Sequence, residues 1–219
     1  MHSVCMDSRM APICAGCFAY RGMMMKAIQK IRDEHRSISA VLHGLKQLAR
    51  DAQNVSVKPD FAVFRAMIHY IDEFPEQLHH PKEDQYLFPP LAARAPDAQA
   101  LIDALRVEHK DGARLVRELE RSLMFFEDSW PLGAAEFVQT VDAYADFHWQ
   151  HMRKEEQQIL PLAERLFSAA DWEMVDRAFD VNRDPMAGVK ERDFQALFSR
   201  IVNLAPDPVG LGERWKKVS

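Results

Sequence analysis

The chain has 219 residues and a formal net charge of −5 at pH 7. This mildly acidic balance gives no overall attraction to nucleic acid or anionic lipid, and a hydrophobic content of 47% excludes a disordered chain. All three cysteines lie at or before Cys17, which excludes a disulfide scaffold, and no apolar run approaches the roughly 18 residues of a membrane span. Only 8 Gly and 12 Pro argue against a turn-rich all-β fold, whereas nine His are a conspicuous excess.

Residues 1–25 show no hydrophobic period and are predicted to form a disordered leader. Charged residues and a proline interrupt their apolar runs, so the segment is a poor secretory signal. Its isolated Cys14-x-x-Cys17 motif is a weak signal for zinc or redox chemistry. The Met23–Met25 run is a candidate natural start of translation, and with either start we expect a reducing cytoplasmic compartment.

Residues 26–167 are predicted to form four long amphipathic helices, because apolar residues recur at steps of three and four along them. We expect a kink or a short break near Pro75 and Pro81. Long helices joined by short loops predict an all-α, antiparallel up-down four-helix bundle. The predicted helices cover residues 26–50, 60–91, 97–123 and 134–167.

Two further helices are predicted after the bundle. The first starts at Asp171 and is broken at Pro185, and the second covers residues 194–201. We expect residues 168–205 to pack as a helical extension on one side of the bundle and residues 206–219 to be a loose tail.

The two halves of the bundle repeat each other. Residues 79–91 (HHPKEDQYLFPPL) align with residues 151–163 (HMRKEEQQILPLA), and His35 in the first predicted helix corresponds to His109 in the third. Such a repeat makes chance placement of each shared residue less credible. The identical pairs are His79/His151, Lys82/Lys154, Glu83/Glu155, Gln85/Gln157 and Pro89/Pro161.

Six side chains of this repeat are expected to converge inside the bundle. A spacing of four residues puts a histidine and a glutamate on one helix face in each half, and the other two histidines lie on apolar stripes. Two buried carboxylates are costly unless they are paired or bind metal, and no Lys or Arg shares their stripes. The predicted metal ligands are His35, His79, Glu83, His109, His151 and Glu155.

The donor set indicates the kind of metal. Nitrogen and oxygen ligands without a thiolate argue against a structural zinc site, and imidazoles suit Fe, Cu, Ni or Zn. Because each carboxylate can bridge two ions, the pattern favours two non-haem irons, bridged by carboxylates and an oxo or hydroxo group. Open coordination positions would then accept O2, NO or peroxide.

These motifs resemble the hemerythrin-like, HHE cation-binding family over residues 26–167. The resemblance implies a four-helix bundle with a non-haem di-iron centre, four terminal histidine ligands and two bridging glutamates, at the positions given above. The tail from Asp171 to Pro185 is also similar to bacterial members. The motifs are Asp33-Glu34-His35, His79-His80-Pro81-Lys82-Glu83-Asp84, Glu108-His109 and His151-Met152-Arg153-Lys154-Glu155-Glu156.

The sequence departs from the oxygen-carrying members at one position. They have a second histidine four residues after the one on the third helix, where this chain has Ala113. His148 is therefore an additional candidate ligand; the alternative is that it orients Glu155 or a bridging water. Its counterpart in the repeat is Glu76, a weaker candidate.

Other polar residues are expected to lie away from the ligand stripe. His80 should face away from His79 in a regular helix, although Pro81 can shift that register. His43 and His69 are predicted to be surface residues. Glu34, Glu108 and Glu156 are expected to face outward or to support the ligands from behind.

Three functions remain open from the sequence. The first is binding of O2, NO or related small molecules, or iron handling, without an organic substrate. The second is a di-iron redox enzyme that reduces peroxide or NO or acts as an oxidase; the ferritin-like version is weaker, because Glu76-x-x-His79 fits its motif but His148-x-x-His151 does not. The third is a metal-dependent sensor or interaction domain. Homo-oligomerisation is open, and no nucleic-acid or membrane partner is expected.

Overall fold

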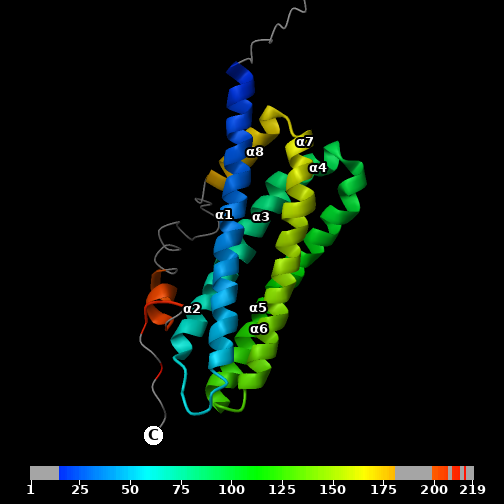
Figure 1. Ribbon diagram of the computed structural model, residues 1–219. Coiled ribbons are helices and arrows are strands. Elements are labelled where there is room, and N and C mark those ends of the chain that lie inside the picture. Colours follow the sequence, from blue (N-terminus) through cyan, green and yellow to red (C-terminus); the bar gives the residue numbers. More distant parts are fainter. Residues whose placement is uncertain (1–14, 181–198, 207–208, 213–214, 216–219) are drawn as a thin grey trace, which may run out of the picture.

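The computed structural model describes residues 15–180, 199–206, 209–212 and 215, and for residues 15–25 it gives the helical course only. Four long helical segments run antiparallel, as the sequence predicts, and the described residues contain no β-strand (Figure 1). The first segment is α1 (Ala15–Asp51), and the third is α5 (Gln99–Ser129), preceded by the 3₁₀ turn η3 (Pro96–Ala98). The second is a continuous series of α2 (Phe61–Ile71), η1 (Asp72–His79), α3 (His80–Lys82), η2 (Glu83–Leu87) and α4 (Phe88–Arg94). The fourth consists of α6 (Ala134–Lys154), η4 (Glu155–Ile159) and α7 (Leu160–Leu166), and α8 (Ala169–Asp180) follows it.

The first helix is longer than the sequence predicts. It begins at Ala15, so residues 15–25, which we expected to belong to a disordered leader, are helical. A helix extends cheaply once its later turns are fixed by packing, and the alanines and methionines here have good helix propensity. Residues 1–14 lie outside the described part of the chain.

The second segment stays helical through both of the prolines expected to interrupt it. Instead of breaking, the chain forms the π-helical turn η1 around Pro75 and a second one, η2, shortly after Pro81. Around Pro75 the wider turn accommodates a residue that has no N–H to donate and that clashes with the carbonyl of the preceding turn. The other two π-helical turns belong to the repeat: η2 begins at Glu83 and η4 begins at Glu155, and each ends two residues before a proline, Pro89 or Pro161.

The apolar interior is divided into two cores. The lower core in Figure 1 includes Leu42, Phe64 and Phe137, near the loops at residues 52–60 and 130–133. The upper core includes Ile31 and Leu105 and belongs to the opposite end of the bundle. On all four segments the residues between these cores are buried polar side chains. This polar layer is where the predicted ligands lie.

The C-terminal extension packs on the bundle where it is described. Ser168 caps α8: its hydroxyl and Asp171 bond each other's backbone N–H groups in a capping box. The helix buries Trp172, Val175 and Phe179 in the upper core and contacts α1. The second predicted helix is described only over residues 199–204, which are helical.

The described part of the tail is not loose, contrary to our expectation. Leu211 donates its backbone N–H to the carbonyl of Val202 at 2.7 Å, and the Trp215 ring lies 6.0 Å from that of Phe64. Gly210 permits this return, because a Cβ there would meet a backbone carbonyl oxygen at 2.4 Å. The partly buried Trp215 ring packs against the lower core, which helps to hold this segment in place.

None of the helices in the described ranges combines the length and apolarity needed to cross a membrane.

Candidate metal centre

The six predicted ligands come together in the polar layer. All are buried, and the two glutamates are 0% exposed. The second and fourth segments each supply a histidine and a glutamate one turn apart, whereas the first and third each supply one histidine. His35 lies on α1, His79 on η1, Glu83 on η2, His109 on α5, His151 on α6 and Glu155 on η4.

Three of the four imidazoles have a carboxylate hydrogen-bonded at the outer nitrogen, Nδ1, and at His109 a carboxylate lies near Nδ1 without forming a hydrogen bond. In a neutral imidazole such a hydrogen bond fixes the single N–H on Nδ1 and leaves the lone pair on Nε2, the arrangement of metal-binding histidines. The carboxylates come from neighbouring helices, so each hydrogen-bonded imidazole is oriented by a second helix. The Nδ1–oxygen distances are 2.9 Å for His35–Glu156, 2.7 Å for His79–Glu34, 3.0 Å for His151–Glu108 and 3.2 Å for His109–Asp84.

The inner nitrogens face each other in pairs. Nε2 of His35 lies 3.0 Å from Nε2 of His79, and Nε2 of His109 lies 3.2 Å from Nε2 of His151. Two lone pairs at this distance repel unless a cation or a proton lies between them. Two nitrogens bound at right angles to one ion at about 2.1 Å would be about 3.0 Å apart, close to both separations.

Glu83 and Glu155 complete the centre. Its inward-facing atoms are imidazole nitrogens and carboxylate oxygens, which can all donate a lone pair to a metal ion. None of the four carboxylate oxygens of these glutamates has a hydrogen-bond partner, although both side chains are fully buried. Glu155 Oε1 lies 3.1 Å from Nε2 of His151, and Glu83 Oε1 lies 3.5 Å from Nε2 of His79. Because buried carboxylates without a partner are strongly disfavoured, this centre requires cations or protons.

The donors divide into two sets that share the glutamates. Within each set the ligand atoms lie within 4.8 Å of one another. Such sharing is what two ions bridged by two carboxylates require, so the residues present fit a pair of metal ions. One set is His35, His79, Glu83 and Glu155, and the other is Glu83, His109, His151 and Glu155.

In the metal-free chain, protons take the place of the missing cations. Burial opposes protonation of His151, but the charges of Glu155 and Glu108 outweigh it and raise its pKa to about 9. Burial and the charge of Glu155 raise the pKa of Glu83 well above its usual range. Burial also disfavours ionised Glu155, yet the neighbouring His151 and His109 imidazoles favour its charged form and lower its pKa. Metal binding would therefore displace protons from this centre.

Two lysines behind the centre complete a pattern that the sequence did not assign. Lys82 Nζ lies 3.1 Å from Glu34 Oε1, and Lys154 makes the equivalent ion pair with Glu108. Asp84, opposite the His109 imidazole, was not singled out either. The internal repeat could have identified this set from the sequence, because Asp84 and Glu156 occupy equivalent positions, as do the two lysines.

His148 lies apart from both ligand sets. Its Nε2 is 3.1 Å from Glu76 Oε1 and 3.0 Å from the hydroxyl of Tyr144. His148 and Glu76, equivalent positions of the repeat, are thus in direct contact. His80, in contrast to the regular-helix expectation, is buried and forms a further group of three with His109 and His151. The π-helical turn η1 and Pro81 change the phase of the helix at this point. His43 and His69 are exposed, as predicted.

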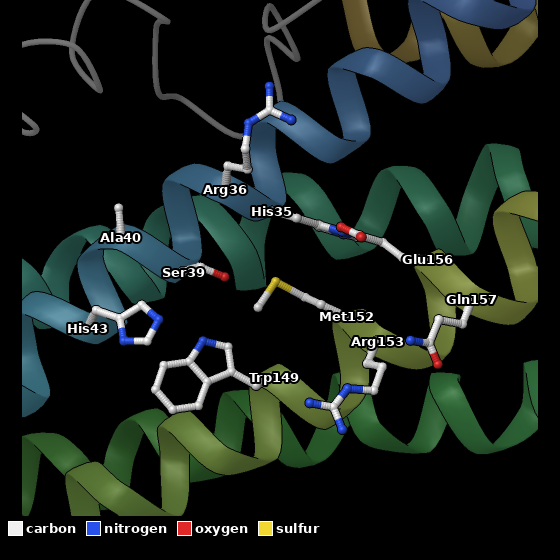
Figure 2. Close-up of a pocket in the computed structure, with 10 residues that line it drawn as sticks. All are labelled: His35, Arg36, Ser39, Ala40, His43, Trp149, Met152, Arg153, Glu156 and Gln157. Carbon is white, nitrogen blue, oxygen red and sulfur yellow. The ribbon is translucent and has the colours of Figure 1, made fainter.

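A solvent-facing pocket of about 740 Å³ lies between α1 and α6 and reaches the centre from one side (Figure 2). His35 and Glu156 point toward each other at one end, and Met152 projects into the middle. Arg36 and Arg153 also line the pocket, which gives it basic groups. The pocket therefore connects solvent with the outer edge of an imidazole whose Nε2 faces the two glutamates.

Comparison with known proteins agrees with this geometry. No curated protein matches the chain. The sequence model of one family, the hemerythrin HHE cation binding domain, matches residues 26–163. This range contains the four helical segments of the bundle from residue 26 up to the last three residues of α7, and all six ligand candidates. The four-helix bundle, the layer of inward histidines and glutamates and this match together identify the chain as a member of the hemerythrin HHE cation-binding family.

Proposed function

We propose that this chain is a non-haem di-iron protein that binds O2, NO or related small molecules, or handles iron, at the centre described above. When bound, two irons would supply the chemistry for reversible binding or reduction of such molecules. We place this function in the reducing cytoplasm, which rests on the confinement of the cysteines to the first 17 residues.

One observation carries the proposal: the inward-facing atoms are all potential metal ligands, and they form two sets that share Glu83 and Glu155, whose oxygens have no hydrogen-bond partner. Imidazole nitrogens and carboxylate oxygens without thiolate favour iron among the transition metals that bind such bridged sites. The carboxylates hydrogen-bonded to Nδ1 of His35, His79 and His151 support the assignment, because they hold each of these rings with its lone pair directed inward.

The surrounding residues limit what reaches the centre. Apolar cores above and below the polar layer exclude water along the bundle axis. The pocket at His35 is open to solvent and is large enough for a small reactant. The pocket carries charged groups of both signs, Arg36, Arg153 and Glu156.

The same pocket supports a second candidate, a di-iron redox enzyme, because it offers a reductant access to the edge of the centre. The two functions are separated by exposing the reduced protein, kept without oxygen, to O2, peroxide and NO in turn. A persistent change in the absorption spectrum indicates reversible binding, whereas repeated consumption of the reactant indicates turnover.

Metal analysis tests the proposal directly. Protein expressed in iron-replete medium should contain about two irons per chain, because the donors form two sets that share both glutamates. A single ion per chain, or zinc in place of iron, would contradict the di-iron assignment.

Matched histidine variants control for indirect effects on this measurement. His79→Ala and His151→Ala should each lower the iron content, because both remove an inward Nε2. His43→Ala and His69→Ala change exposed residues and should leave the iron content unchanged. Equal losses in all four variants would show that the inward set is wrong.

A further inference from the structure

His80 is a buried imidazole that the two ligand sets do not use. It is 4% exposed, and its ring stacks on that of His109 with the centroids 4.3 Å apart and the planes 8° apart. The His151 ring lies 5.2 Å away, nearly perpendicular. The ligand atoms of His80, His109 and His151 lie within 4.8 Å of one another. Opposite ligands of one ion bound at about 2.1 Å are about 4.2 Å apart, so small movements bring all three onto one ion.

The outer nitrogen of His80 has a carboxylate partner, like those of His35, His79 and His151. Its Nδ1 lies 3.2 Å from Oε2 of Glu76, a buried carboxylate one turn earlier on the same segment. A neutral ring that donates its N–H to Glu76 keeps its lone pair on Nε2. His80 therefore has the orientation and the tautomer of a metal ligand, although its helix position alone predicts neither.

Glu76 is held firmly in this role. Its other oxygen, Oε1, lies 3.1 Å from the Tyr144 hydroxyl and 3.1 Å from Nε2 of His148. The third segment makes room for the carboxylate at Gly112, where a Cβ would come within 2.7 Å of Glu76 Oε1. The chain thus has a carboxylate, two hydrogen-bonding partners and a glycine clearance arranged behind one imidazole.

The other half of the repeat has no equivalent arrangement. The position that corresponds to His80 is Met152, which lies beside the pocket near His35. A thioether is a poor ligand for iron among hard oxygen donors. The centre is therefore unequal, with an additional imidazole on the side of His109 and none on the side of His35.

We infer that His80 is a third imidazole ligand of the metal position formed by His109 and His151, held in place by Glu76. The inference rests on the proposed function, since it assigns a ligand within the proposed di-iron centre. It predicts two metal positions of different affinity, the tighter one containing three imidazoles.

Metal titration of the full chain tests this. Metal-free wild-type protein and the variants His80→Ala, His80→Gln and His69→Ala are titrated with Fe(II) under anaerobic conditions. Wild type should bind two ions in two steps. Both His80 variants should weaken one step at least about tenfold and leave the other near its wild-type value. His69→Ala, the control at an exposed histidine of the same segment, should retain both steps. Free imidazole should restore the weakened step in His80→Ala, because it can occupy the space of the deleted ring.

Cobalt(II)-loaded wild-type protein gives a second measurement that does not depend on the folding of a variant. Each ligated imidazole should contribute one paramagnetically shifted, exchangeable Nδ1 proton to the NMR spectrum, so five are expected. Four shifted protons, or unchanged titration steps in correctly folded His80→Ala and His80→Gln, would overturn the assignment of His80. If wild type does not bind two ions, the proposed di-iron function fails instead.

Discussion

Carboxylates at the outer nitrogens decide which nitrogen of the inward histidines faces a metal. Glu34 accepts from His79 at 2.7 Å and is itself paired with Lys82. Because the proton stays on the outer nitrogen, the inner one is available to a metal without loss of the ring's orientation. Glu156 and Glu108 orient His35 and His151 in the same way, so this arrangement occurs in both ligand sets of the centre.

The two central glutamates should respond differently to neutralisation. In chelated protein at pH 7, Glu83→Gln should leave the free energy of unfolding unchanged or raise it, because burial and the charge of Glu155 raise the pKa of Glu83 and so disfavour its charged form, which the neutral amide does not have. Glu155→Gln removes the charge that pairs with His151, whose pKa is about 9. Its loss should cost roughly 3–5 kcal/mol, the range for breaking one partner of a buried charge pair.

With iron bound, both substitutions should lower the free energy of unfolding, because each replaces a carboxylate that faces both ion positions with an amide. Denaturant unfolding of both variants, with and without a chelator, measures these effects. If Glu83→Gln destabilises chelated and loaded protein equally, that glutamate has a structural role and does not bridge metals.

At the scale of the elements, the π-helical turns and α8 shape the centre. The turns η2 and η4 begin at Glu83 and Glu155, so the repeat preserves an irregular turn at each glutamate. α8 covers the neighbouring face: the Phe179 ring lies 6.1 Å from the His79 ring, and Lys82 Nζ lies 4.5 Å from the centre of the Phe179 ring.

Removing the Phe179 ring should therefore affect both stability and metal retention. Phe179→Ala should lower the free energy of unfolding by about 3–5 kcal/mol, since the side chain is fully buried. It should also speed iron loss to a chelator, because water gains access to the Lys82–Glu34–His79 group. Met174, 39% exposed on the same helix, provides the control; Met174→Ala should change stability by less than about 0.5 kcal/mol. Equal effects of the two substitutions would show that α8 does not cover the centre.

Over the whole molecule, a polar layer separates two apolar cores, and each helical segment crosses it once. The cores supply hydrophobic stabilisation, whereas the metal-free layer opposes it through unpartnered carboxylate oxygens. Metal ions would convert this unfavourable layer into a link between all four segments.

Chelation should consequently lower the thermal midpoint of unfolding. An ion present at 100 to 1,000 times its dissociation constant stabilises a protein by about 2.7–4.1 kcal/mol, and its removal reverses that gain. Calorimetry with stepwise additions of Fe(II) should show the midpoint rising with free metal. A midpoint that does not depend on iron would mean that the folded chain does not bind it preferentially.

The sequence by itself predicts the bundle and the six residues that point into it, because both depend on local spacing. Steps of three and four residues place side chains on one face of their own helix, as for His79 and Glu83. The internal repeat then relates the two halves without knowledge of which helices touch. Asp171 likewise indicated the last helix, whose cap at Ser168 lies three residues earlier.

Tertiary structure decided what depends on phase and on contacts between helices. The π-helical turn η1 alters the phase that regular spacing assumes, and thereby turns His80 inward. The carboxylate partners of the imidazoles lie on neighbouring helices, as Glu34 does for His79, so no spacing within one helix specifies them. Contact between Glu76 and His148 likewise follows from how the second and fourth segments pack. Periodicity describes one helix at a time, whereas the pairing of side chains across a core is set by packing of the assembled bundle.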